Sequence, residues 1–268
     1  MINATAGILT LNSAKSIFKC LNNLKYFKEI IILDGGSVDS TLEIAKKFKC
    51  RILKQKKIFK FTNKSIKNFS LARNFILEKA KHDLVLMLDS DEILHSCYFK
   101  KIDFLSKSMI MKKKYYSFLI PRVPYLENSV YKKTNLYPNF QPRLMYKSNI
   151  KSYIKDVHEK PIPINNKLKQ LKIKNLYITF LAELTDAQIK RKLEYYTLIE
   201  KKMTSKKSIR SIYYILNGLF ILFRMFIKIL IYRKSNKKIT IFEKKSITSR
   251  MLRLCLLLIY KFNIFKKI

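Results

Sequence analysis

Apolar and polar positions along the first ninety residues switch repeatedly between a strand-like and a helix-like pattern. Continuous apolar runs predict buried strands at Ala4–Leu11, Glu29–Leu33 and Leu84–Leu88, and Arg51–Gln55 is a weak strand, the third of the four in chain order. Helical spacing predicts helices in between, at residues 13–24, 39–48 and 70–81. Asn12-Ser13 and Ser70 offer N-cap side chains for two of them. Alternating strands and helices predict an α/β fold, Rossmann-like, with a mostly parallel sheet between flanking helices.

Acidic residues follow two of the predicted strands directly. Asp34 ends the second strand and Asp89 the fourth, and ligands of parallel sheets bind beyond the carboxyl ends of the strands. In Asp89-Ser90-Asp91, two carboxylates one residue apart can face one divalent cation, and Mg²⁺ or Mn²⁺ prefers such oxygen ligands. The alternative is an acidic turn that caps the next segment.

The segment Asp34-Gly35-Gly36-Ser37 joins a strand to a helix. Asp34 can accept a hydrogen bond from a base or a ribose, while the glycines let backbone amides approach a ligand. An ordinary strand-to-helix turn is the alternative. The chain has neither a GxGxxG nor a Walker A motif at this place, so dinucleotide cofactors and P-loop chemistry are unsupported.

Two further groups of residues are candidates for chemistry. Arg73, on the helix before the Asp89 strand, could hold a diphosphate or orient the acidic site, or be an exposed helix arginine. From about residue 112 the periodicity fades: Tyr115–Pro121 could be a strand, and prolines then punctuate an irregular, aromatic stretch. There, Asp156-Val157-His158-Glu159 offers a general base and an imidazole, or forms a solvated turn.

The charge is strongly positive. Lys and Arg number 56 against 18 acids, a formal net charge of +38, which indicates nucleic acid, anionic lipid or an anionic substrate as partner. AT-biased codons also produce Lys-, Ile- and Asn-rich chains. The excess of Lys over Arg is unfavourable for reading base edges. The start, MINATAGILTLN, has no signal-peptide pattern, so we expect the catalytic part in the cytoplasm.

The uneven charge suggests two domains, residues 1–180 and a basic helical tail at 181–268. The first divides into two halves, at about 1–110 and about 111–180. In the tail, Ile209–Tyr232 and Ser249–Phe262 are apolar apart from a basic stripe on each. A spanning helix would bury Arg224 in the bilayer at a cost of about 2.5 kcal/mol or more. We therefore expect amphipathic helices on an anionic membrane surface, with packed or spanning helices as alternatives.

Six short motifs occur in one order over residues 4–160, and together they resemble family 2 glycosyltransferases of GT-A fold. In particular, they are similar to the bacterial group that adds glucose to the lipopolysaccharide inner core. The motifs are Thr10-Leu11-Asn12, Asp34-Gly-Gly-Ser-Val-Asp39 with Thr41-Leu-Glu-Ile-Ala45, Ala72-Arg73-Asn74-Phe75, Leu88-Asp89-Ser90-Asp91-Glu92, Pro138-Asn-Phe-Gln-Pro-Arg-Leu144 and Val157-His158-Glu159.

The resemblance implies an inverting hexosyltransferase that moves glucose or another hexose from a nucleotide sugar to a cell-envelope glycan or glycolipid. It implies that residues 1–110 form the nucleotide-sugar half and residues 111–180 the acceptor half. It implies a peripheral enzyme at the cytoplasmic face of the plasma membrane, dependent on Mg²⁺ or Mn²⁺. The implied metal ligands are Asp91 and Asp89, and the implied catalytic base is Glu159, with Asp156 second. The residues implied to bind the nucleotide sugar are Thr10, Asn12, Asp34, Ser37, Arg73 and Asp89. Those implied to contact the acceptor are Gln141, Arg143 and His158. The alternatives are a basic nucleic-acid-binding protein, although no recognised motif for one is present, and a nucleotidyltransferase.

Overall fold

A computed structural model describes residues 1–56, 68–126, 129–130, 138–155 and 159–181, with single helical positions at 220, 223, 227, 251 and 255. The chain divides into two compact units, Met1–Ala182 and Glu183–Ile268. Most of the predicted basic tail, including most of its two apolar segments, lies outside the described residues. Of the helices in the described ranges, none is both long and apolar enough to cross a membrane.

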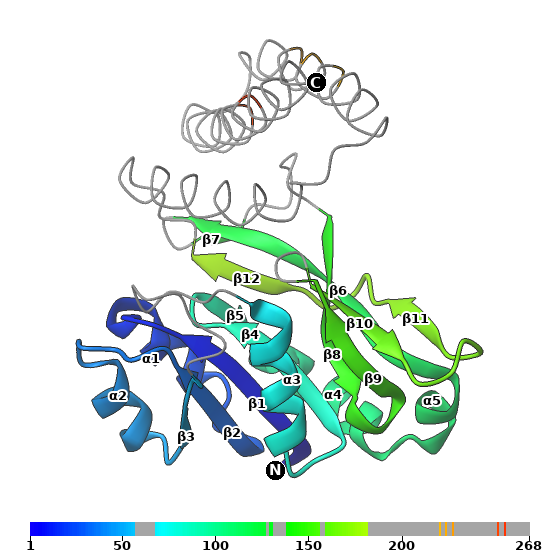
Figure 1. Ribbon diagram of the computed structural model, residues 1–268, viewed down its shortest axis with the longest axis horizontal. Helices are drawn as coiled ribbons and strands as arrows, with labels where there is room; N and C mark the ends of the chain where they lie inside the picture. The colour runs from blue at the N-terminus through cyan, green and yellow to red at the C-terminus, as the bar shows by residue number, and fades with distance from the viewer. Residues whose placement is uncertain are drawn as a thin grey trace, which may run out of the picture. The chain divides into compact units, whose positions relative to one another are not determined.

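The first part of unit 1 has the predicted alternation of strands and helices (Figure 1). Four strands lie in the order β3-β2-β1-β4, and all three pairings are parallel. Thr10 of β1 is in register with Asp34, and Leu9 with Asp89, so the carboxyl ends of three strands meet at one edge. The predicted α/β class with a mostly parallel sheet is confirmed. The bounds are β1 Ile2–Thr10, α1 Ala14–Asn22, β2 Phe27–Asp34, α2 Thr41–Lys47, β3 Arg51–Lys54, α3 Phe69–Lys79 and β4 Leu84–Asp89.

The stretch after residue 112, expected to be mostly irregular, instead extends the same sheet. β8 pairs antiparallel with β4, and β6, β12 and β5 follow it in order. These strands contain three prolines, Pro121, Pro124 and Pro142. Proline is rare inside a sheet and is tolerated at bulges and free edges, so in the sequence these residues indicated a loop where the structure has strands. The bounds are β5 Glu92–Leu94, α4 Phe99–Lys107, α5 Met109–Lys114, β6 Tyr115–Leu126, β7 Ser129–Val130, β8 Asn139–Tyr146, β9 Ile150–Ile154, β10 Lys160–Pro163, β11 Lys169–Lys172 and β12 Ile178–Leu181.

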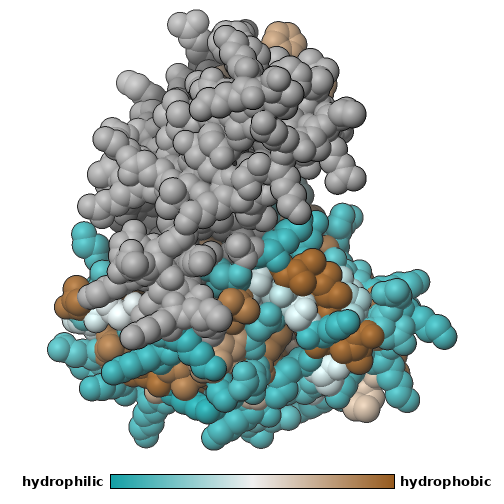
Figure 2. Space-filling model, in the orientation of Figure 1, coloured by the Kyte–Doolittle hydropathy of each residue, from teal (hydrophilic) through white to brown (hydrophobic). Residues whose placement is uncertain are grey.

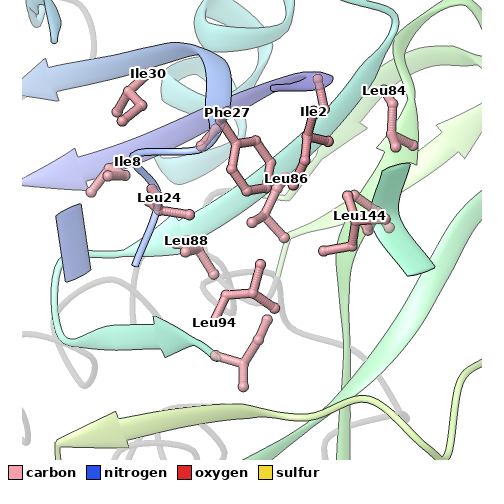
Figure 3. Close-up of a cluster of buried hydrophobic side chains, with 14 of the residues drawn as sticks. Ile2, Ile8, Leu24, Phe27, Ile30, Leu84, Leu86, Leu88, Leu94 and Leu144 are labelled. Carbon is pink, nitrogen blue, oxygen red and sulfur yellow. The ribbon is translucent and has the colours of Figure 1, made fainter. Parts of the chain in front are cut away.

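Both faces of the parallel strands are covered, which explains their continuous apolar runs. On one face, Ile8, Leu86 and Leu88 pack with residues of α1 and α4, and Figure 3 shows side chains from β1, β2, β4, β5 and β8 meeting there. On the other face, Val85 and Met87 pack against α3 and β9. Alternate residues of each strand therefore serve two separate apolar clusters.

Two predicted helix caps are wrong. α1 has Ser13 at its N-cap position, but the Ser13 side chain makes no capping hydrogen bond. α3 begins at Phe69, and the side chain of Asn68, not Ser70, accepts from the backbone N–H of Leu71 at 2.9 Å. Both serines instead bond to other parts of the fold, because tertiary partners satisfy their hydroxyl groups.

Gly7 lets α3 lie directly on β1. A Cβ atom at this position would overlap the Cγ2 atom of Ile76 and lie 3.3 Å from the sulfur of Met87. Ile76 is fully buried on α3, so it has little room to move away. The absence of a side chain at position 7 thus sets how closely this helix approaches the sheet.

We predict that Gly7→Ala lowers the free energy of unfolding by about 1–3 kcal/mol, the usual cost of overpacking a close-packed core. Ile76→Ala removes the obstructing methyl group. Urea denaturation of both single variants and of the double variant measures their coupling. The double variant is expected to lose less stability than the sum of the singles. Strict additivity would show that the two positions do not contact each other.

Candidate active site

Two loops at the carboxyl edge of the sheet are hydrogen-bonded to each other. Asn12, after β1, has a φ of 48°, a left-handed conformation that asparagine tolerates better than most residues. Its side-chain oxygen accepts from the N–H of Val38 at 2.9 Å, and its own N–H donates to the hydroxyl of Ser37 at 2.9 Å. The predicted nucleotide-binding residues Asn12 and Ser37 therefore lie side by side, and they fix the shape of the edge.

Asp34 is 2% exposed and accepts several bonds from its own loop. The N–H of Gly36 donates to it at 2.7 Å, and the hydroxyl of Ser37 at 2.6 Å. Gly36 has a φ of 99°, which favours glycine, and this lets the loop fold back over the carboxylate. In this structure Asp34 shapes the loop, and its expected contact with a base or ribose stays a prediction.

The turn after β4 is joined to the same edge. The hydroxyls of Ser13 and Ser90 are 2.7 Å apart, and Ser90 stands between Asp89 and Asp91. Thr10 is 3% exposed; its carbonyl accepts from Gly35 at 2.8 Å, but its buried hydroxyl has no hydrogen-bond partner among the residues described. The loops after β1, β2 and β4 thus form one connected surface.

Beside this surface lies a cluster of three arginines and three carboxylates. Asp89 accepts from Arg73 at 3.1 Å with one oxygen and from Arg143 at 2.6 Å with the other. Arg73 also pairs with Glu159. Arg73 and Arg143 are 3% and 6% exposed, so their charges depend on these partners.

Glu92 lies at the centre of this ion cluster and is fully buried. It accepts from the N–H of Asp89 at 3.0 Å and from Arg143 at 2.7 Å, and it pairs with Arg122 of β6. The sequence interpretation did not assign a role to Glu92 or Arg122. Glu92 stands in the quoted acidic motif, whereas Arg122, between two prolines of β6, gives no signal that separates it from a surface arginine.

A β-bulge brings Arg143 into the cluster. Phe118 of β6 pairs with Leu144, but the next residue, Leu119, pairs with Pro142, so Arg143 is the extra residue on β8. A bulge of this kind redirects a side chain and increases the local twist. Arg143 thereby reaches both Asp89 and Glu92 from β8, a strand of the antiparallel part of the sheet.

α3 holds both ends of the segment at 156–158. Asn74 exchanges two hydrogen bonds with the backbone of Tyr153, at 2.6 and 3.1 Å, and Ser70 donates to the carbonyl of Lys155. Arg73 pairs with Glu159 on the other side of the segment. The adjacent residues Arg73 and Asn74 therefore fix the chain at Glu159 and Tyr153, on either side of this segment.

The arginines of the cluster keep Asp89 and Glu159 ionised. Burial raises the pKa of Asp89, but Arg143 and Arg73 outweigh burial and bring that pKa well below its usual range. Burial likewise raises the pKa of Glu159, and its pairing with Arg73 brings it below the ordinary value. Burial lowers the pKa of Arg143, but the charges of Asp89 and Glu92 outweigh burial, so the pKa of Arg143 lies above its ordinary value.

Asp91 adds a fourth carboxylate at this strand end and is half-buried. Within the described ranges, no three His, Cys, Asp or Glu side chains gather as a metal site. Mg²⁺ is commonly held by one or two carboxylates together with substrate phosphates, so Asp91, with Asp89 beside it, fits a shared site of that kind. Both oxygens of Asp89 already accept from arginines, so Asp89 would share them with a bound cation.

Not every predicted residue joins this site. Gln141 of β8 donates to the side chain of Asn139 at 2.9 Å, a bond within its own strand rather than to the ion cluster. Asp156 and His158 lie outside the described residues. The structure thus brings together Arg73, Asp89, Arg143 and Glu159 in one cluster, with Thr10, Asn12, Asp34 and Ser37 on the adjoining loops.

Residues 5–105 match the model of Glycosyl transferase family 2. The SPbeta prophage-derived glycosyltransferase SunS of Bacillus subtilis is 31% identical over 176 residues, which are 65% of this chain and 38% of that protein. A glycosyltransferase of Haemophilus influenzae is 33% identical over 106 residues, 39% of this chain and 41% of that protein. The matches thus span about two fifths of these relatives.

Solved structures give weaker likenesses. S. aureus TarS residues 1–349 in complex with UDP-GlcNAc has a TM-score of 0.48 and 17% identity, over 74% of this chain and 65% of that chain. Glucosyl-3-phosphoglycerate synthase from Mycobacterium tuberculosis, with Mn²⁺, UDP and glucosyl-3-phosphoglycerate, has a TM-score of 0.34 and 18% identity, over 45% of this chain and 43% of that chain.

We predict that Glu92→Gln lowers the free energy of unfolding by about 3–5 kcal/mol, because it leaves the buried Arg143 and the half-buried Arg122 with one fewer carboxylate. Urea denaturation measures the loss. Glu78→Gln is the matched control: Glu78 pairs with Lys79 at 2.7 Å, but its side chain is 61% exposed, so solvent replaces the lost partner. Equal losses for the two variants would contradict a central role for Glu92.

Proposed function

We propose that this chain, which belongs to glycosyl transferase family 2 through its residues 5–105, transfers a hexose such as glucose from a nucleotide sugar to a cell-envelope glycan or glycolipid. The observation that carries the proposal is the connected carboxyl edge, where the Asp34 loop and the Asp89-Ser90-Asp91 turn meet through Ser13 and Ser90. A lipopolysaccharide core is the acceptor that the sequence motifs favour. The basic-protein alternative does not account for this edge.

Different residues of the carboxyl edge would bind different parts of the donor. The loop of Asn12, Asp34 and Ser37 is already folded by its own hydrogen bonds, so we assign it to the base and ribose without a large ordering cost. Asp91, with Asp89, would hold Mg²⁺ or Mn²⁺. When bound, the cation stabilises charge that develops on the leaving nucleoside diphosphate. Arg73 and Arg143 keep the turn in place through Asp89.

Proton transfer needs a carboxylate beside the acceptor hydroxyl. Glu159 is our first choice and Asp156 the second. The pairing of Glu159 with Arg73 keeps it ionised at neutral pH, as a base must be, although the lowered pKa weakens its basicity. Attack by the hydroxyl in one in-line displacement would invert the anomeric carbon.

Donor use is the first test. With Mn²⁺ and a panel of nucleotide sugars, we expect the chain to release a nucleoside diphosphate, and Asp91→Asn to lower that rate by roughly a hundredfold or more through loss of a charged metal ligand. Chelation by EDTA should have the same effect on the unaltered chain. Titration with Mn²⁺, followed by its electron paramagnetic resonance signal, measures binding separately from activity.

Asp103→Asn is the matched control, because Asp103 lies on α4 and pairs with the exposed Lys107. This variant should keep full activity. Release of pyrophosphate would indicate a nucleotidyltransferase. Undiminished activity of Asp91→Asn, or in EDTA, would exclude the metal assignment.

We further propose that the tail holds the enzyme peripherally on the cytoplasmic face of the plasma membrane. Phe220, Phe223 and Ile227 support this, since they are helical, exposed by 58%, 62% and 38%, and spaced by three and four residues. Arg224 and Lys228 stand next to them in the sequence. An apolar face bordered by basic residues is typical of helices that lie in the interface of anionic bilayers.

We predict that the full chain floats with anionic vesicles and that a chain ending at residue 205 floats much less. Because basic residues add electrostatic attraction, salt should weaken the binding, while the apolar face prevents complete release. Sucrose-gradient flotation with neutral and anionic vesicles measures both effects. Equal flotation of the two chains would contradict the tail as a membrane contact.

A further inference from the structure

α4 and α5 present large apolar side chains to solvent. Phe104, Met109 and Ile110 are exposed by 62%, 61% and 79%, and six positions separate the first from the last. On the face drawn in Figure 2, hydrophobic side chains reach the surface in separate groups between hydrophilic ones. Single exposed apolar residues are normal, but three close together on consecutive helices indicate a contact surface.

The core does not account for these three side chains. α4 already buries Ile102 and Leu105 against the sheet, and the carbonyl of Leu105 accepts from the hydroxyl of Tyr146 at 2.7 Å. Phe104 stands between these two positions and is directed outward. α5 begins at Met109 after a capping bond from the N–H of Met111 to the hydroxyl of Ser108, at 3.3 Å. Buried contacts therefore hold α4 in place, while Phe104, Met109 and Ile110 remain exposed to solvent.

Lysines surround the apolar group. Residues 99–114 contain six lysines and one acid, Asp103, a formal charge of +5. Lys107 pairs with Asp103 at 2.6 Å, and Lys112 with Asp83 at 2.9 Å. The other four, Lys100, Lys101, Lys113 and Lys114, are exposed. We call these four lysines, with Phe104, Met109 and Ile110, the α4–α5 surface.

We propose that the α4–α5 surface docks on an anionic phospholipid bilayer. Lysines attract lipid phosphates over about one Debye length, roughly 8 Å at physiological salt, while apolar side chains enter the boundary between headgroups and acyl chains. Long lysine stems suit this position, because they lie along an apolar surface and keep the ammonium group among the phosphates. The complementarity of charge and the exposed apolar group select this partner over an acidic protein, which would leave the apolar side chains uncovered.

The position of this surface in the sheet sets the orientation on the membrane. α5 contacts Asp83, directly before β4, whereas the acidic turn follows β4 at its other end. Six residues of β4 separate the two edges, about 20 Å at roughly 3.3 Å per residue. A chain docked through this surface therefore holds its acidic edge away from the lipid. This inference does not depend on the proposed activity or on the tail.

The chain contains no tryptophan, so one introduced tryptophan reports its own surroundings. In full-length Ile110→Trp mixed with phosphatidylglycerol vesicles, we expect a blue shift of the emission and quenching by brominated acyl chains. Val38→Trp is the matched control: Val38 is also 79% exposed, but it lies beside Asp39 at the opposite edge of the sheet. Its emission should change little.

A charge variant tests the lysines separately. Changing Lys100, Lys101, Lys113 and Lys114 to Glu in the Ile110→Trp chain should raise the lipid concentration for half-maximal quenching by roughly tenfold or more. Thermal unfolding of each variant checks the fold, and Phe104→Trp repeats the reporter at a position that is already aromatic.

Two outcomes would overturn the inference. If the Ile110→Trp and Val38→Trp chains give the same emission shift and the same quenching, the α4–α5 surface does not enter the bilayer, even when the chain floats with vesicles through its tail. Equal insertion of the Ile110→Trp chain into phosphatidylcholine vesicles would overturn the role of the lysines.

Discussion

The arrangement of unit 1 depends on the mutual neutralisation of buried charges around Glu92. A buried guanidinium or carboxylate is costly unless it has an opposite charge and hydrogen bonds close by. Arg122, Arg143 and Glu92 come from β6, β8 and β5, and α3 adds Arg73. These elements can only approach one another with their charged groups in register, since any displacement leaves a buried charge without its partner.

The same constraint joins the two halves of the unit. Asp89 ends a strand of the parallel half, and Arg143 reaches it from the antiparallel half through a bulge. A turn that carries candidate metal ligands is therefore supported from the side on which an acceptor is expected. A displacement of the antiparallel half would also move the turn after β4, because Asp89 at that turn is bonded to Arg143 of the antiparallel half.

The sequence was sufficient for the parallel half of the fold but not for the rest. Buried runs such as Glu29–Leu33 and Leu84–Leu88 are short and continuously apolar, as strands covered on both faces are, and the acids that follow them, Asp34 and Asp89, marked the strand ends. β6 and β8 contain prolines, which in a sequence indicate a loop. The pairing of these two strands includes a β-bulge, and no local sequence pattern predicts it. The two arginine partners of Glu92 are 30 and 51 residues away in the chain, so they become visible only in three dimensions.

Residues Ser70, Arg73 and Asn74 of α3 hold the chain on either side of positions 156–158, at Tyr153, Lys155 and Glu159. The entropic cost of closing a loop between fixed ends grows only slowly with its length. Insertions between Lys155 and Glu159 would therefore leave the carboxyl edge of the parallel strands unchanged. Such a scaffold is evolvable in a directed way: the sequence between these two fixed points can be rewritten while the edge that carries Asp34, Asp89 and Asp91 is inherited intact.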